Sequence, residues 1–168
     1  MATPKYRFIP LPYMQEVAAR LASETPTLIR GSLYTYRLPL LSEKIRPIIS
    51  REVTNDLKNW AKAEQKVVTP TTKSRFLRLK APDSLWTDEG YTSLLVPLFD
   101  RTIQVSVRAR GSDEEALIDW GCESILHLDE RMGIRTLTED IDFHLNIFQL
   151  TVTPGTMAEE EYDGDTGV

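Results

Sequence analysis

Apolar and polar residues alternate most regularly in residues 102–110. Ile103, Val105, Val107 and Ala109 are separated by polar residues, which is the two-residue period of a strand with one buried face. Residues 142–153 also predict a long strand, and the phase of their apolar positions shifts at Ile147-Phe148, as expected for a β-bulge or for burial on both faces. Shorter strands are predicted at residues 33–38, 75–80, 93–99 and 134–137.

Three other segments have apolar residues at spacings of three and four, which predicts amphipathic helices. The first two are expected at about residues 12–23 and 47–65. The third follows Gly111, where Ser112 and Glu115 have the spacing of a capping box. Its apolar face would include Leu117, Trp120 and Leu128, and it would end near residues 131–133.

This order of elements predicts an α+β fold, with an antiparallel or mixed sheet and helices packed mainly on one face. The three helical patterns argue against an all-β alternative. Residues 1–11 are predicted to form an extended arm, residues 12–155 a single α+β domain with a candidate insertion at 47–80, and residues 156–168 a disordered acidic tail. A chain of 168 residues fits one domain.

The net charge of -5 is concentrated in that tail. Its five acidic residues have no basic neighbour, so residues 1–155 carry no net charge. A body without basic excess argues against general nucleic-acid binding. No secretory leader or membrane span is expected from the pattern of apolar residues, and the single cysteine excludes an internal disulfide.

Candidate catalytic and metal-binding residues are few. His127 and His144 lack the spacing of a metal site and would need a carboxylate such as Asp129 or Asp142. Cys122 has no basic neighbour that would activate it. The acidic cluster of Glu139, Asp140 and Asp142 lacks the lysine spacing of a nuclease, and there is no glycine-rich phosphate loop. We therefore expect no catalytic residue, no metal, no cofactor and no enzymatic activity.

A second group of residues suggests a protein interface. The strand at 75–80 is rich in basic residues, which fits a charged sheet edge or a contact surface. Trp86 lies in a polar loop and is a candidate contact anchor. The acidic tail has the charge to contact the basic strand of a neighbouring subunit. The candidate interface residues are Lys73, Arg75, Arg78, Lys80, Trp86, Glu159, Glu160 and Glu161.

Residues 99–153 resemble tail terminator and neck proteins of tailed bacteriophages. The resemblance is carried by the strand TIQVSVRAR, the turn Gly111-Ser112-Asp113, the segment EEALIDWGCESILHLDE and the closing strand DFHLNIFQLTVT, with PYMQEVAARLAS matching an opening helix. It implies a structural virion protein that caps the tail tube as a homohexameric ring and joins the head-tail neck.

The partners that this resemblance implies are further copies of the chain, the tail tube and sheath, and a neck connector or stopper. It implies neither a membrane nor a sequence-specific nucleic acid as partner, and it places the protein in the virion. A small α+β interaction or regulatory domain of bacterial origin is the alternative, and a hydrolase with unrecognised acidic residues is a third.

Overall fold

The computed structural model describes residues 6–10, 27–30, 33–36 and 53–153. In these residues the chain forms eleven strands and one helix. In chain order they are β1 (Tyr6–Pro10), β2 (Thr27–Arg30), β3 (Leu33–Tyr36), α3 (Thr54–Ala63), β4 (Lys66–Leu79), β5 (Ser84–Trp86), β6 (Tyr91–Pro97), β7 (Ile103–Ala109), β8 (Glu115–Trp120), β9 (Ser124–Leu128), β10 (Met132–Thr136) and β11 (Ile141–Val152).

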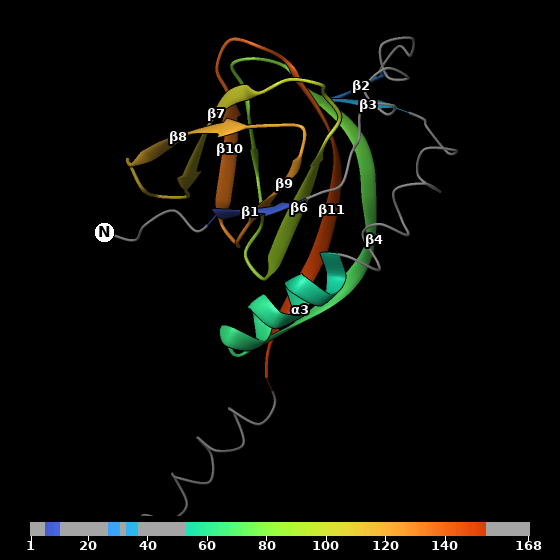
Figure 1. Cartoon of the computed structure of the whole chain (residues 1–168), viewed down its shortest axis with the longest axis vertical. Coiled ribbons are helices and arrows are strands. Elements are labelled where there is room, and N and C mark those ends of the chain that lie inside the picture. Colours follow the sequence, from blue (N-terminus) through green and yellow to red (C-terminus); the bar gives the residue numbers. More distant parts are fainter. Residues whose placement is uncertain (1–5, 11–26, 31–32, 37–52, 154–168) are drawn as a thin grey trace, which may run out of the picture.

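The strands form two antiparallel sheets. The larger has seven strands in the order β1-β9-β6-β11-β4-β3-β2, and the smaller has four in the order β5-β10-β7-β8. The long strands β4 and β11 run side by side along the molecule, and α3 lies across their lower end in Figure 1. Neighbouring strands in a sheet are often distant in sequence. From β4 onward the chain also passes repeatedly from one sheet to the other.

Strand β11 is the centre of the large sheet and separates two hydrophobic cores. It pairs with β4 on one side and β6 on the other. Its residues Phe143 and Leu145 point into the core between the two sheets, whereas Phe148 and Leu150 belong to a second core on the outer side of the large sheet. The alternation of side chains along a strand produces this division.

The helix α3 covers the second core. Its side chains Leu57 and Ala61 are buried, and Trp60 packs against the same cluster. These positions are spaced as one face of a helix, so α3 forms for the reason that the sequence predicts. The described helix ends at Ala63, two residues before the predicted end, and residues 47–52 of the predicted span lie outside the described part.

The predicted α+β fold class is wrong, because the structure is mostly antiparallel β-sheet. The main error is the helix expected at about 112–132, which is the hairpin strand β8 and the following strand β9. In β8 the inward residues are Ala116, Ile118 and Trp120, a two-residue period. Ser112 forms a turn instead of a helix cap, since its hydroxyl accepts a hydrogen bond from the Glu114 amide at 3.2 Å.

Several other predicted elements agree with the structure. The alternating strand at 102–110 is β7, and the long closing strand is β11, whose pairing with β4 shifts register between Asn146 and Phe148 at the predicted bulge. The helix expected at 12–23 and the acidic tail lie outside the described residues. Residues 6–10 of the predicted arm form β1, paired with β9; the proposed domain boundaries stay predictions. No described helix has the length and apolar character needed to cross a membrane.

The division of β11 between two cores can be tested by truncating a side chain of the inter-sheet core. Phe143 is fully buried there, so we expect Phe143→Ala to lower the free energy of unfolding by about 3–5 kcal/mol. Val152→Ala, in an exposed position of the same strand, is the matched control and should change it little. Chemical denaturation followed by circular dichroism measures both, and equal effects would contradict the assignment of the core.

Candidate functional site

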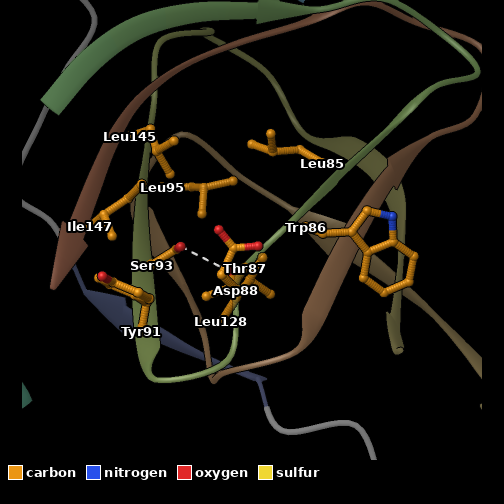
Figure 2. Close-up of a pocket in the computed structure, with 10 residues that line it drawn as sticks. All are labelled: Leu85, Trp86, Thr87, Asp88, Tyr91, Ser93, Leu95, Leu128, Leu145 and Ile147. Atoms are coloured by element: carbon orange, nitrogen blue, oxygen red, sulfur yellow. Dashed lines mark hydrogen bonds between the residues drawn. The ribbon is translucent and has the colours of Figure 1, made fainter. Parts of the chain in front are cut away.

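The space between the two sheets contains a cavity. It has a volume of about 90 Å³ and adjoins another of about 270 Å³. The walls are mostly apolar, and Figure 2 shows Leu85, Leu95, Leu145 and Ile147 gathered on one side of the first cavity. Leu85, Leu145 and Ile147 line both cavities, and the second also has Leu33, Arg75 and Leu77 in its wall. Together the two cavities form an apolar site with few polar groups, which is the usual character of a small-molecule site.

The polar groups of the first cavity lie at the end of β5 and the start of β6. Thr87 and Ser93 are buried, and the Thr87 hydroxyl donates a hydrogen bond of 2.9 Å to that of Ser93, as Figure 2 shows. The exposed Asp88 and the half-buried Tyr91 complete this end of the cavity. A carboxylate and a phenol therefore border the same apolar space.

Backbone contacts hold the segment that carries these groups. The Thr87 amide donates to the carbonyl of Met132, and the Thr87 carbonyl accepts from the Arg131 amide. Gly90 has φ of +81°, a conformation that favours glycine. Its amide donates at 2.8 Å to Glu130, whose other carboxylate oxygen pairs with Lys66. The turn bearing Asp88 and Tyr91 is thus fixed to the rest of the sheet.

The basic strand predicted as an interface is part of β4, in the large sheet. Arg78 forms a two-point ion pair with Asp142 at 2.8 and 3.1 Å, and Lys80 lies over the ring of Tyr34. Arg75 is exposed and borders the larger cavity. The side chain of Lys73 and residues Glu159, Glu160 and Glu161 are outside the described set. The predicted contact between the acidic tail and this strand stays a prediction.

Trp86 does not contribute its ring to the cavity. Figure 2 shows its indole turned away from the apolar cluster. The ring lies over Gly133 on the outer face of the four-stranded sheet. Whether it anchors a partner, as its place in a polar loop suggested, stays a prediction.

His127 is buried on the outer side of the large sheet, away from the inter-sheet cavity. The Arg7 Nε–H donates to His127 Nδ1 at 2.8 Å, so the neutral ring carries its proton on Nε2. This proton is donated to the Thr92 hydroxyl at 2.6 Å, which in turn donates to the carbonyl of Leu128. Trp60 of α3 contacts the ring edge to face. Arg7 also pairs with Asp56 of α3, so the network joins β1, β9 and the helix.

Burial lowers the pKa of His127 to about 3, and the neighbouring Arg7 guanidinium adds to the effect. The ring is therefore neutral at physiological pH. It acts as a fixed link between elements, and both of its nitrogens are occupied.

His144 lies on the same outer face, in contact with Phe76. Its Nδ1 is 3.0 Å from the amide nitrogen of Asn146, and its Nε2 is 2.8 Å from the Ser74 hydroxyl. The Asn146 amide is a donor, so the histidine proton is on Nε2 and is donated to Ser74. A catalytic histidine must instead accept the proton of the serine. This arrangement therefore does not activate Ser74 as a nucleophile.

The remaining sequence candidates are dispersed. Glu139 pairs with Arg101 at 2.9 Å, Asp140 accepts a hydrogen bond from the Ala81 amide, and Asp142 pairs with Arg78. Cys122 is half-buried in the turn between β8 and β9. Each acidic side chain of the predicted cluster thus has its own structural contact.

The two histidines are too far apart to bind one metal ion. His127 pairs with Leu94 of β6 from one side, and His144 pairs with Val96 from the other. Two strand spacings separate them, roughly 10 Å, whereas two nitrogens bound to one ion lie within about 4 Å of each other. Among residues 6–10, 27–30, 33–36 and 53–153, no group of three His, Cys, Asp or Glu side chains is arranged to hold a metal.

Comparison with known proteins gives structural similarity only. No protein-family model matches the chain, and no curated protein matches its sequence. HygX from Streptomyces hygroscopicus, solved with nickel and 2-oxoglutarate, is 16% identical, with a TM-score of 0.54 over 88% of this chain and 83% of HygX. SnoN, a non-heme alpha ketoglutarate dependent epimerase from nogalamycin biosynthesis, is 10% identical, with a TM-score of 0.57 over 87% of this chain and 78% of SnoN.

These similarities show a β-rich, cupin-like fold, and they correct the interpretation of the sequence. Both structures are enzymes and neither is a phage structural protein. The resemblance to tail terminators is therefore wrong, as are the virion role and the alternative of an α+β interaction domain. The expectation of a non-enzymatic chain is contradicted for the same reason. The predicted ring, tube and neck partners and the virion location stay untested.

A metal centre like those of HygX and SnoN does not fit the residues of this chain. Non-heme iron sites of 2-oxoglutarate-dependent enzymes use two histidines and a carboxylate on one face. The chain has two histidines, and both lie outside the inter-sheet cavity with their nitrogens engaged. The fold is shared, but these histidines cannot supply that ligand set.

The amount of metal that the protein binds can be measured directly. We expect the purified protein, incubated without oxygen with Fe²⁺ or Ni²⁺ and then desalted, to retain far less than one equivalent, because its histidines are apart and occupied. Elemental analysis gives the ratio. One equivalent of metal per chain in the wild type, lost in His127→Gln or His144→Gln, would show that the two rings do form a centre.

A second measurement concerns the charge of His127. Its pKa of about 3 in the folded protein is below the ordinary 6.5, so the unfolded chain binds the extra proton first as pH falls. Stability should therefore be fully present above pH 6.5 and decrease toward pH 3, by about 2 kcal/mol between pH 7 and pH 5. Denaturation curves at several pH values measure this slope. His127→Gln should be less stable at pH 7 but lack this part of the slope, and an unchanged slope would contradict the assignment.

Proposed function

We propose that the chain is an enzyme that binds a small, sugar-like molecule between its two sheets and acts on it by proton transfer, without a bound metal. The observation that carries this proposal is the inter-sheet cavity, whose apolar walls meet a carboxylate and a phenol at one end. The cupin-like fold supports it, because the structurally similar SnoN is an epimerase.

The size of the site favours a small substrate. The larger cavity, of about 270 Å³, lies just below the range of roughly 300–1,000 Å³ that is common for ligand sites. A single sugar ring suits such a space better than a polymer. Its apolar C–H face would contact the leucine walls, and its hydroxyl groups would meet the polar end at Thr87 and Ser93.

Asp88 and Tyr91 are the residues we assign to proton transfer. A carboxylate accepts a proton from carbon most readily next to a carbonyl group, and a phenol can return a proton to the resulting enolate. Removal from one face and return at the other inverts the carbon, which is epimerisation. The backbone bonds of Thr87 and Gly90 hold both residues in place, as proton transfer requires.

Arg75 is assigned to substrate binding. Among the described residues it is the one charged side chain in the wall of the larger cavity, and a guanidinium pairs well with a carboxylate or phosphate. The far end of the site would thus select substrates that carry an anionic group. The direction of binding follows: the anion lies toward β4 and the reacting carbon toward the β5–β6 turn.

The reaction can be tested by following exchange of carbon-bound protons. We expect the protein, in D₂O with a chelator, to exchange the proton beside the carbonyl of a keto-sugar in a panel of keto-sugars and their anionic derivatives, observed by NMR. Asp88→Asn and Tyr91→Phe should each lower the rate at least about 100-fold, in the range for loss of a general acid or base. Asp119→Asn, in an exposed position of β8, is the matched control and should leave the rate unchanged.

Three results would contradict this function. Exchange that the chelator abolishes would show that a metal performs the chemistry. Exchange that continues in both cavity variants, or its absence for every member of the panel while the ligands bind, would remove Asp88 and Tyr91 as the catalytic pair.

A further inference from the structure

The outer face of the four-stranded sheet, opposite the inter-sheet cavity, carries a second group of polar residues. Trp86 comes from β5, Gly133 and Arg135 from β10, and Ser106 and Arg108 from β7. The register places Arg108 beside Gly133 and Ser106 beside Arg135. We call this group the outer platform; Arg110, at the end of β7, and Glu115, from β8, complete it.

Trp86 lies on this platform against Gly133, which has no side chain. A Cβ atom on Gly133 would lie 2.5 Å from Cε3 of the indole and 2.7 Å from two other ring carbons. Only a glycine therefore lets the ring lie flat on the strand. The indole is held in place, although it lies on the outside of the sheet.

The fixed indole positions two guanidinium groups. The Cζ atoms of Arg108 and Arg110 are each 5.4 Å from the centre of the ring, within the range of cation–π contacts. Within the part of the chain that the structure describes, neither arginine forms an ion pair. Two like charges are thus held together by one aromatic ring, and Glu115, opposite Arg108 in the register of β7 and β8, pairs with Arg135 instead.

Two buried donors beside them also have no partner. Ser106 is 1% exposed, and neither its hydroxyl nor the buried Nε of Arg135 has a hydrogen-bond partner among the residues that the structure describes. Arg135 is oriented by Glu115, which pairs with its Nη2 at 3.0 Å. Both donors line a small hollow of about 10 Å³ that is also bordered by Trp86 and Arg108. Such a space is roughly that of one oxygen atom of a water or ligand, and buried donors are normally satisfied.

We propose that the outer platform binds a phosphate monoester, a dianionic group carried by a small molecule. One phosphoryl oxygen would enter the hollow and accept hydrogen bonds from the Ser106 hydroxyl and Arg135 Nε. The remaining oxygens would accept from Arg108 and Arg110. The three arginines and Glu115 carry a net charge of two, which matches a dianion, and guanidinium groups bind phosphate through paired hydrogen bonds.

This site is separate from the one that we assign to catalysis. It faces away from the inter-sheet cavity and shares with it the backbone of β5 but no reacting group. The platform can therefore bind its ligand whether or not the cavity acts as proposed.

The probes for this site are glucose 6-phosphate, inorganic phosphate and uncharged glucose, titrated into the full chain at low salt by calorimetry. We expect saturable binding of the two phosphates and none of glucose, with affinity that falls as salt rises. Arg108→Gln with Arg110→Gln should weaken binding at least about tenfold, and Ser106→Ala by roughly threefold to tenfold, as expected for lost hydrogen bonds to a charged group.

The matched control is Arg101→Gln, which removes an arginine that is paired with Glu139 away from the platform. It should bind as the wild type does, and circular dichroism should show that every variant is folded. Equal affinity in the wild type and the double variant, or no saturation by about 10 mM phosphate, near the weak end of specific binding, would overturn the proposal. A water molecule alone would then fill the hollow.

Discussion

The pairing of β11 with both β4 and β6 is the constraint on which the rest of the structure depends. A strand at the centre of a sheet has side chains on two faces, and in β11 both faces are buried. Phe143 and Leu145 therefore fill the space between the sheets, while His144 and Phe148 face the helix side. A register shift of one residue would exchange these two sets, and it would bring a histidine into the cavity.

The strands with a clear two-residue period were predictable from the sequence, as β7 and the bulged β11 show. The segment from Glu115 to Leu128 was not, because it satisfies two periods at once. Ala116, Ile118 and Trp120 alternate as in a strand, yet Leu117, Trp120 and Leu128 also fall on one helical face. Pairing with β7, β6 and β1 decides between them. Such long-range partners override local preference and cannot be read from a neighbourhood of ten residues.

The candidate site was less predictable than the fold. Its residues are ordinary leucines, a tyrosine and an aspartate in a segment that reads as a turn, and no short motif connects them. They meet because β5 belongs to one sheet and β6 to the other. The two histidines lack the spacing of a metal site in the sequence, and in the structure burial and hydrogen bonding make them part of the framework. The chemical type of a residue in the sequence does not show which face of a sheet its side chain occupies.

The contact between Trp86 and Gly133 has an evolutionary consequence. Because a β-carbon at position 133 would occupy the space of the indole, substitutions at positions 86 and 133 should be coupled. A relative with alanine or a larger residue at 133 should also have lost the tryptophan, and with it the support for the neighbouring arginines. Covariation of these two sites among homologues would thus record which lineages kept a flat aromatic surface on the outer face of the four-stranded sheet.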